Sequence, residues 1–508
     1  MNYNSISFFA IFLPLLILVY ELFPQNNRKY VLLAANYLFF CLLSKFLVVY
    51  QLAVVLITYF VGIKLEKIES SSSGNDRKIT AKKKKKVFVL GVLLNLGILI
   101  VLKYTNFIGE TFLRSHWTVL NLLVPVGISY YSLQAVSYLA DIRAKKYSAE
   151  HNIFNLALYL SFFATIMEGP IARYNEISAS LFSGNAVTYA NLTVGYQRIL
   201  WGLFEKVVIA DHLANGVSYL FKQTYLAGSL SLLAAVLCTL QMYMDFAGTI
   251  DIAIGSARIF GIYLPENFRQ PFFAKNASEF WRRWHITLGT FFRDYIFYPV
   301  SLSRPIMRLT KWTKKHIGRQ CAKYIGPSIA LLFVWLANGF WHGPRWTYIF
   351  YGIYYFVLIL VELFTEQPIK NLYIKFHINE NGIGLKIFRF IKLFIIVIVG
   401  EMFFRADSFS KGWGMLTSIF TDFNLSVFRE QWKYVGIGVA DYLIVFLGLA
   451  VVLIVSILRE KNISIRNIIN KRPLYQRWIF WYACIMVVVF LGAYGQGFGA
   501  VDMLYAGF

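Results

Sequence analysis

The chain has 508 residues, of which 58% are hydrophobic and 15% are charged, whereas soluble proteins average about 25% charged residues, so the composition excludes a soluble enzyme and a disordered chain. The four cysteines lie far apart and show no paired spacing, which excludes a secreted scaffold held by disulfides. The formal net charge is +24, but the cations form blocks between apolar stretches, as the positive-inside rule explains, so we expect membrane lipid and no nucleic acid as their partner.

The apolar stretches predict an all-α polytopic membrane protein with roughly 11–13 membrane helices, several shorter than the ~20 residues that a crossing requires. The first stretch has no basic residue before it and no cleavage site after it, so we expect an uncleaved anchor. In chain order the stretches are Ile6–Tyr20, Tyr30–Leu43, Phe46–Ile63, Val87–Leu102, Leu120–Leu139, Ile153–Met167, Ile199–Ile209, Leu230–Met244, Ile329–Trp341, Trp346–Leu363, Leu393–Phe404, Tyr442–Leu458 and Ile479–Leu491.

Two basic segments set the expected orientation in the membrane. Lys64–Lys86 holds nine Lys and Arg residues and is predicted to be a solvated cytoplasmic loop. Arg304–Lys323 contains cations and no acid, and we expect it to be cytoplasmic as well. This orientation places the amino terminus and the segment Asn106–Arg114 outside.

Polar and ionisable residues gather in the middle third, between Met244 and Arg345, where Gly and Pro are also frequent. Buried charge is costly in a bilayer, so such residues usually face a bundle interior or a wet cavity. Broken helices are tolerated at membrane depth only where protein or a cavity surrounds them. Both features predict a site inside the membrane core.

Within that third, Asn276 with Glu279 three residues later is typical of a helix start. The spacing from Trp281 onward then places aromatic and apolar residues on one face of a single helix that runs to Asp294. An interfacial amphipathic helix, with His285 only a polar neighbour of the interface, explains this periodicity as well. The residues of that face are Trp281, Trp284, His285, Leu288 and Phe292, with Arg282, Arg283, Arg293 and Asp294 around the helix.

His342 follows the apolar stretch from Ile329 and precedes a Gly-Pro pair, so it is predicted at a helix end near membrane depth. Asn338 lies one turn earlier. A neutral imidazole is a natural general base near pH 7, and a structural histidine bonded to a neighbouring carbonyl is the alternative.

Other chemistries lack their residues. No His, Cys, Asp and Glu grouping has metal-ligand spacing, so no metal is expected. No phosphate-binding loop and no Gly-x-Ser-x-Gly nucleophile motif occurs.

Seven stretches of the chain form an ordered set of motifs. They are EGPIARY (Glu168–Tyr174), GLFEKVVIAD (Gly202–Asp211), MDFAGTIDIAIG (Met244–Gly255), LPENFRQPF (Leu264–Phe272), FWRRWHITLGTFFRDYIFYP (Phe280–Pro299), NGFWHG (Asn338–Gly343) and FFRADSF (Phe403–Phe409). Any one of them would be weak evidence, but the seven in this order resemble the membrane-bound O-acyltransferase family in its bacterial alginate O-acetylase and D-alanyl-lipoteichoic-acid branch.

By this resemblance His342 is the catalytic histidine and His285 a second active-site position. The resemblance also implies a ring of membrane helices around a thin central tunnel, a cytoplasmic acyl thioester donor, and a hydroxyl acceptor on the far side. An extracytoplasmic relay or acceptor protein is the implied partner. The expected substrate-binding residues are Trp281, Arg282, Arg283, Trp284, Arg293, Asp294, Asn338 and Trp341, with Phe340 as a further tunnel-lining residue.

Several features leave the acyl group open. Glu168 replaces a residue that is usually small in the family, and Glu205 stands where a basic residue is common. The FWHG motif resembles the D-alanyl branch of the family more, whereas chain length and FFRADSF resemble the alginate-type acetylases, which implies acetyl transfer to a cell-envelope polysaccharide. We therefore expect acetyl-CoA as the donor, with a D-alanyl carrier protein as the alternative, and no bound cofactor.

A transporter or flippase with a polar permeation path is the alternative from another class, although no two-halves duplication supports it. The resemblance implies one domain over residues 1–508. Amino-terminal spans would occupy residues 1–118, a catalytic core 119–409 and carboxy-terminal spans 410–508. We expect a multi-pass protein of the bacterial cytoplasmic membrane.

Overall fold

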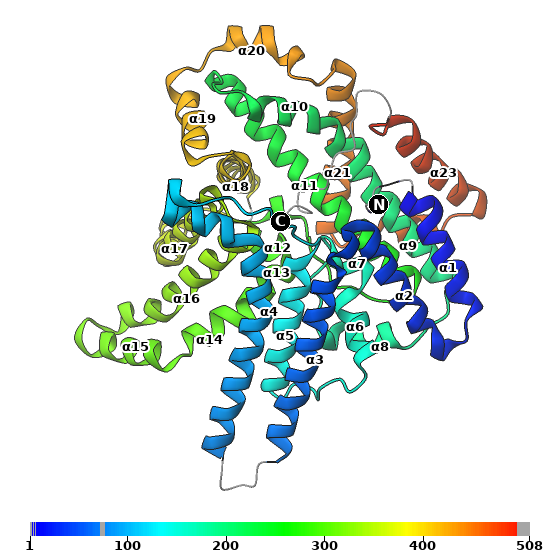
Figure 1. Cartoon of the computed structure of the whole chain (residues 1–508). Helices are drawn as coiled ribbons and strands as arrows, with labels where there is room; N and C mark the ends of the chain where they lie inside the picture. Colours follow the sequence, from blue (N-terminus) through cyan, green and yellow to red (C-terminus); the bar gives the residue numbers. More distant parts are fainter. Residues whose placement is uncertain (1–2, 4, 6, 72–76, 381, 495–508) are drawn as a thin grey trace. The chain divides into compact units, whose positions relative to one another are not determined.

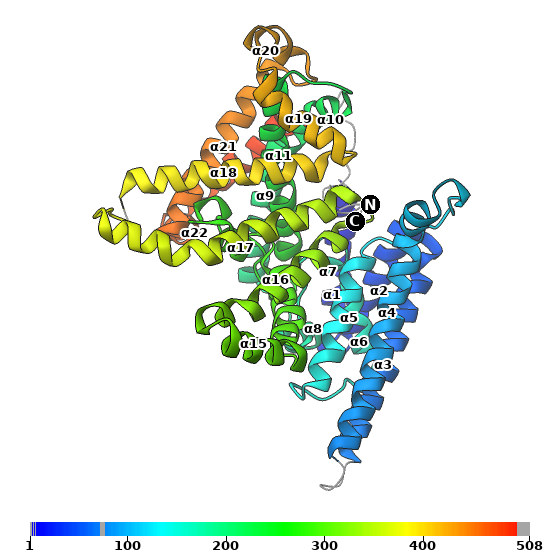
Figure 2. The same ribbon diagram turned by 90° about the vertical axis from the view of Figure 1, so that its left-hand side faces the viewer.

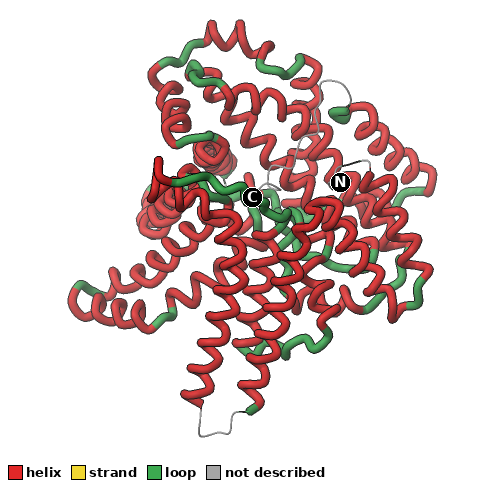
Figure 3. Tube along the Cα trace, viewed as in Figure 1, coloured by secondary structure: helices red, strands yellow, loops and turns green. Residues whose placement is uncertain are grey.

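The computed structural model describes residues 3, 5, 7–71, 77–380 and 382–494, and within these ranges every regular element is a helix (Figures 1 and 3). The predicted all-α class is therefore confirmed. Seven helical stretches in the described part are long and apolar enough to cross a membrane, and most of the other predicted stretches form shorter helices. The seven are Gln25–Ser70, Lys78–Leu113, Gly228–Ile259, Arg319–His342, Trp346–Lys375, Val439–Glu460 and Leu474–Leu491.

The described chain divides into two compact units. The first comprises the described residues up to Trp201 together with Thr249–Pro265. Its helices are α1 (Leu13–Leu22), α2 (Gln25–Ser44), α3 (Val48–Ser70), α4 (Arg77–Leu113), α5 (Ile128–Arg143), α6 (Ile153–Ser161), α7 (Phe163–Ile166), α8 (Tyr174–Phe182), most of α9 (Tyr189–Leu203) and the end of α11 (Gly228–Ile259). In this unit α3 and α4 run side by side, with α5 packed against both (Figures 1 and 2).

The second unit comprises Gly202–Gly248 and the described residues from Glu266 onward. In it α16 packs on α15 and α17, and α17 packs on α18 (Figure 2). Its helices are α10 (Asp211–Lys222), the first part of α11, α12 (Ala277–Arg283), α13 (Ile286–Phe292), α14 (Tyr298–Ser301), α15 (Arg304–His316), α16 (Arg319–His342), α17 (Trp346–Lys375), α18 (Ile383–Arg405), α19 (Phe409–Thr421), α20 (Leu425–Gln431), α21 (Val439–Glu460), α22 (Ile465–Asn470) and α23 (Leu474–Leu491).

The prediction of a loop over Lys64–Lys86 was wrong for most of that segment. Helix α3 continues to Ser70 and α4 begins at Arg77, while residues 72–76 lie outside the described residues. Glu69 on α3 forms an ion pair with Lys84 on α4 at 2.6 Å, and the Lys84 ammonium also donates to the Arg143 carbonyl. These contacts join the two helices beyond their apolar stretches.

Two other predicted boundaries differ for local reasons. The stretch Leu120–Leu139 was expected to be one helix, but α5 begins only at Ile128. Gly127, with φ 75°, precedes it, and a Cβ atom there would stand 1.7 Å from the Ile166 carbonyl oxygen. Only glycine accepts both the conformation and the close contact. Gly248, one of the glycines of the middle third where broken helices were expected, lies within continuous α11 and packs against the Gly202 carbonyl.

Candidate active site

His342 is the last residue of α16 and its side chain is buried, with 2% exposed. The helix ends there because Gly343 adopts φ 148°, a conformation that residues with a side chain rarely adopt. Pro344 follows and has no amide hydrogen to continue the helix. The predicted position of His342 at a helix end is confirmed.

The aromatic rings of Trp341, Tyr348, Tyr351 and Phe404 pack against the His342 imidazole. The ring centroids lie 5.0 Å away for Trp341, 5.8 Å for Tyr351, 6.2 Å for Tyr348 and 4.9 Å for Phe404. Trp341 comes from α16, the two tyrosines from α17 and Phe404 from α18. Three helices therefore build a largely apolar wall around one base, which limits the access of bulk water.

The predicted single helix over Asn276–Asp294 is instead two helices with a break at Trp284 and His285. Helix α12 ends at Arg283, and α13 begins at Ile286. His285 itself has φ 45° and ψ 52°, in the left-handed region. Left-handed backbone is uncommon outside glycine and is concentrated at functional sites. The periodicity therefore predicted the helical residues correctly but missed the break.

Asn267 holds this break in place, and its side chain is fully buried. Its Oδ1 accepts hydrogen bonds from the Thr287 amide at 3.0 Å and from the Thr287 hydroxyl at 2.9 Å. His285 Nδ1 lies 3.2 Å from the same oxygen, and the Ile286 amide donates to the Asn267 carbonyl. Because Oδ1 only accepts, Nδ1 carries the proton, and neutral His285 presents the lone pair of Nε2.

Trp341 connects the two histidines. Its ring stands edge-on to His285 at 5.4 Å between centroids and edge-on to His342 at 5.0 Å. His285 is also buried, with 2% exposed, and the Phe246 ring covers it at 4.9 Å between centroids. The two predicted histidines, His285 and His342, therefore both contact the Trp341 indole.

Asn338 lies one turn before His342 on α16 and is 5% exposed. Within the described part of the chain, no group donates a hydrogen bond to its buried Oδ1. A buried carbonyl oxygen without a donor is costly unless another group satisfies it.

The sequence model of the membrane-bound O-acyltransferase family matches residues 104–404, which is more than half of the chain and includes both histidines. The chain belongs to this family. It is therefore an O-acyltransferase and a multi-pass membrane protein, which takes an acyl group from a donor to an acceptor hydroxyl. The transporter alternative is set aside.

Relatives with assigned functions come from bacteria. The chain is 28% identical to a probable alginate O-acetylase of Azotobacter vinelandii, over 89% of this chain and 84% of that protein. It is 29% identical to a peptidoglycan O-acetyltransferase of Helicobacter pylori, over 70% and 66% of the two chains. It is 30% identical to a teichoic acid D-alanyltransferase of Bacillus subtilis, over 49% of this chain and 61% of that protein.

The predicted tryptophans of this O-acyltransferase take different positions. The Trp281 ring packs on Trp335 and Tyr355, each at 4.9 Å between centroids, and on Tyr351 at 6.1 Å. The Trp284 ring instead packs among Tyr243, Phe268 and Phe280. Phe340, expected to line a tunnel, is 43% exposed.

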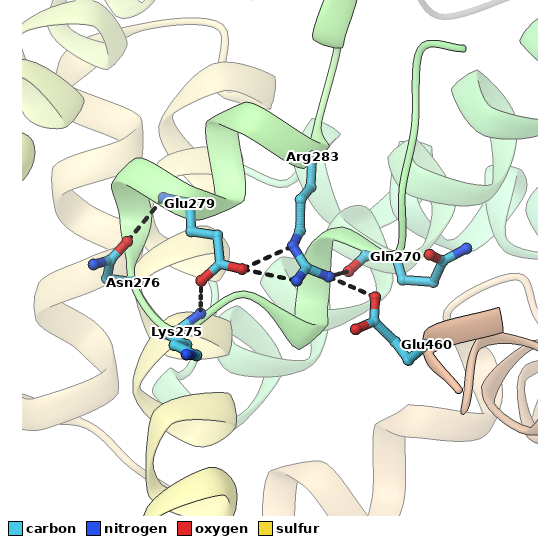
Figure 4. A network of polar contacts seen from close by, with 6 residues as sticks. All are labelled: Gln270, Lys275, Asn276, Glu279, Arg283 and Glu460. Carbon is cyan, nitrogen blue, oxygen red and sulfur yellow. Dashed lines mark hydrogen bonds and ion pairs between the residues drawn. The ribbon is translucent and has the colours of Figure 1, made fainter. Parts of the chain in front are cut away.

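Arg283 belongs to a polar network around α12 (Figure 4). Its guanidinium forms ion pairs with Glu279 at 2.7 Å and with Glu460 at 2.6 Å. Asn276 caps α12 as predicted, by accepting from the Glu279 amide at 2.8 Å, but the Glu279 carboxylate accepts from the Lys275 amide instead of closing a capping box. Arg283 therefore holds α12 in place through these bonds.

Glu279 shows the effect of this network. Burial alone would raise its pKa, but the Lys275 amide and the Arg283 guanidinium outweigh burial and hold the pKa of Glu279 below its ordinary value. Helix α12 lies outside the seven spanning stretches. The other two predicted arginines are exposed: Arg282 at the end of α12, and Arg293, which pairs with Asp294 at 2.9 Å.

Two of the stretches that resemble the family, Gly202–Asp211 and Met244–Gly255, meet at a buried ion cluster. Lys206 is fully buried in the π-helical segment Phe204–Ala210. Its Nζ lies 2.5 Å from Asp211 Oδ1 and 2.7 Å from Asp245 Oδ1. Asp245 directly precedes Phe246, the ring that covers His285. The cluster therefore fixes the backbone beside the site.

Glu401 and Tyr351 were not among the predicted site residues. Glu401 is the only acidic residue of the apolar helix α18 and is 1% exposed, and the Tyr351 hydroxyl donates to its Oε1 at 3.1 Å. An acid inside an apolar stretch is a functional candidate by default, so the signal was present. No group of three or more potential metal ligands occurs in the described ranges.

Proposed function

We propose that this O-acyltransferase transfers an acetyl group from a cytoplasmic thioester to a hydroxyl of a cell-envelope polysaccharide, with His342 as the general base. The observation that carries the proposal is the pair of buried histidines against Trp341, in the part of the chain that matches the family. A polysaccharide hydroxyl is a poor nucleophile at neutral pH and needs a base within hydrogen-bond reach.

In the proposed step, a ring nitrogen of His342 takes the proton of the acceptor hydroxyl, and the hydroxyl oxygen attacks the carbonyl carbon of the thioester. The tetrahedral intermediate collapses, the carbon–sulfur bond breaks, and the thiolate leaves and recovers the proton from the imidazolium. The ester is formed and the base is regenerated. The aromatic wall excludes water, which would otherwise compete as acceptor.

His285 has a different proposed role because its Nδ1 is engaged by Asn267. Its Nε2 can only accept in the neutral form, and no described group donates to it. We assign it to positioning the donor, through an amide or hydroxyl hydrogen of the thioester carrier. Arg282 and Arg293, which are exposed, remain the proposed contacts for donor phosphates, while Arg283 is occupied by two carboxylates.

Acetyl is favoured over D-alanyl by the extent of similarity. The match to the alginate O-acetylase covers 89% of this chain, and the match to the D-alanyltransferase covers 49%. Acetyl-CoA is accordingly the proposed donor. A bulky charged thioester cannot cross a bilayer, so we place it on the cytoplasmic face and the hydroxyl acceptor, or a relay protein, on the other, with residues 119–409 as the catalytic core.

Sealed vesicles of known orientation test this proposal. Labelled acetyl-CoA supplied on the cytoplasmic face should acetylate a polysaccharide enclosed on the opposite face, and a labelled D-alanyl carrier protein should not support transfer. Transfer of D-alanine and not of acetyl would contradict the acetyl assignment and indicate D-alanyl transfer instead. Transfer only when donor and acceptor share one face would contradict the transmembrane route.

A further inference from the structure

A hydrogen bond between Glu401 and Tyr351 connects α18 to α17 next to the ring contact of Tyr351 with His342. The Tyr351 hydroxyl donates to Glu401 Oε1 at 3.1 Å, and both side chains are buried, each with 1% exposed. Tyr351 also contacts the candidate active site, because its ring stands edge-on to the His342 imidazole at 5.8 Å between centroids.

The same helix turn supplies a second contact to the base. Phe404, three residues after Glu401 on α18, lies 4.9 Å from His342 and 5.0 Å from Tyr351 between ring centroids. Residues three apart lie on the same face of a helix. Fixing Glu401 against Tyr351 therefore fixes Phe404 and Tyr351 together as adjacent rings packed on the imidazole.

Stability alone does not account for a carboxyl group at this position. Within the described residues no group bonds Glu401 Oε2, which is fully buried. Burying such an oxygen is costly, and an apolar side chain of similar volume would avoid the cost. The carboxyl group instead accepts the hydrogen bond of Tyr351, whose ring contacts a base that must be held within reach of a reacting hydroxyl.

We propose that Glu401 is a positioning residue that orients His342 through the hydrogen bond it accepts from Tyr351. This inference rests on the proposed role of His342 as the general base. Glu401 acts as an acceptor of the Tyr351 hydrogen, so the feature that matters is an oxygen at the Oε1 position rather than a negative charge.

Four variants of the full-length enzyme test the inference. Glu401→Met and Tyr351→Phe each remove the hydrogen bond and should lower kcat about 10- to 100-fold, because a displaced catalytic group loses its reactive geometry, with KM little changed. Glu401→Gln keeps an acceptor oxygen and should stay within a few-fold of the wild type. Tyr354→Phe is the matched control, since its hydroxyl also joins α17 to α18, at the Ile396 carbonyl, and its loss should leave kcat unchanged.

Two further measurements separate positioning from folding. The midpoint of thermal unfolding of Glu401→Met should equal or exceed that of the wild type, while its kcat falls. The double variant Glu401→Met/Tyr351→Phe should be no slower than the slower single variant, because both remove one interaction.

The possible results distinguish the two levels of the proposal. Wild-type kcat in Glu401→Met and Tyr351→Phe, beside an inactive His342→Ala, would overturn the positioning role and leave the base assignment intact. A Glu401→Gln enzyme as slow as Glu401→Met would overturn the acceptor role. Full activity of His342→Ala would overturn the base assignment and the Glu401 inference with it.

Discussion

Gly352 on α17 lies directly against Gly339 on α16: a Cβ atom on Gly352 would stand 3.5 Å from the Cα of Gly339 and 2.3 Å from the Trp335 carbonyl oxygen. A Cβ atom on Gly339 would lie 2.6 Å from the Tyr348 carbonyl oxygen. Small residues allow helix backbones in membranes to approach closely. This approach sets the tyrosines of α17 against His342 at the end of α16.

Gly352→Ala should therefore destabilise the protein by about 1–3 kcal/mol, the usual cost of overpacking, and reduce acyl transfer. Thermal unfolding and transfer rate, measured on the same preparation, check this. Gly414→Ala on α19 is the control, because nothing lies within 4 Å of its added Cβ and alanine favours a helix. A Gly352→Ala protein as stable and active as Gly414→Ala would show that α16 and α17 pack differently.

Asn267→Ala should remove the hydrogen bonds that hold the backbone break at His285 between α12 and α13. Losing the three contacts to its Oδ1 should cost about 2–3 kcal/mol of stability, at roughly 1 kcal/mol for each hydrogen bond, and should slow transfer because the left-handed conformation of His285 loses its support. Asn276→Ala removes the ordinary cap of α12, which is worth about 1 kcal/mol, and should leave transfer intact. Equal transfer rates in Asn267→Ala and Asn276→Ala would show that Asn267 does not support the active site.

The Glu279–Arg283 contact predicts a pH dependence of stability. Because the folded-state pKa of Glu279 lies below its unfolded value, its contribution is fully present above the unfolded pKa and is lost as the pH falls through the folded pKa. Glu279→Gln should therefore lower the unfolding midpoint near neutral pH, and the difference from wild type should vanish in acid. Glu366→Gln, in an exposed ion pair with Lys370, should show almost no effect at either pH. A Glu279→Gln difference that persists unchanged in acid would contradict the charge effect.

Cys321 is a native reporter of orientation, since it is exposed within the basic segment Arg304–Lys323. In a Cys41→Ser, Cys484→Ser background, an impermeant thiol reagent should label Cys321 only after cells are permeabilised. Glu110→Cys, in the segment predicted to lie outside, should react in intact cells. Labelling of Cys321 in intact cells would refute the cytoplasmic assignment of this segment.

The helices, the cap at Asn276 and the helix-end position of His342 could be predicted from local signals in the sequence, because periodicity and helix-start residues act over a few positions, whereas the choice of His342 and His285 as site residues came from the family resemblance. The break at His285 could not, since it depends on Asn267, 18 residues away, whose hydrogen bonds overcome a regular helical pattern. The contact between Tyr351 and Glu401 spans 50 residues and requires the packing of α17 on α18. The roles of the site residues, the tunnel and the domain limits remain predictions.

The transfer rate of His342→Ala tests the proposed chemistry most directly. Removing the base should lower acyl transfer about 10²- to 10⁴-fold, the usual contribution of general-base catalysis, while the protein still inserts and accumulates. His316→Ala, an exposed histidine on α15, should transfer at the wild-type rate. Wild-type transfer by His342→Ala would contradict the assignment of His342 as the base.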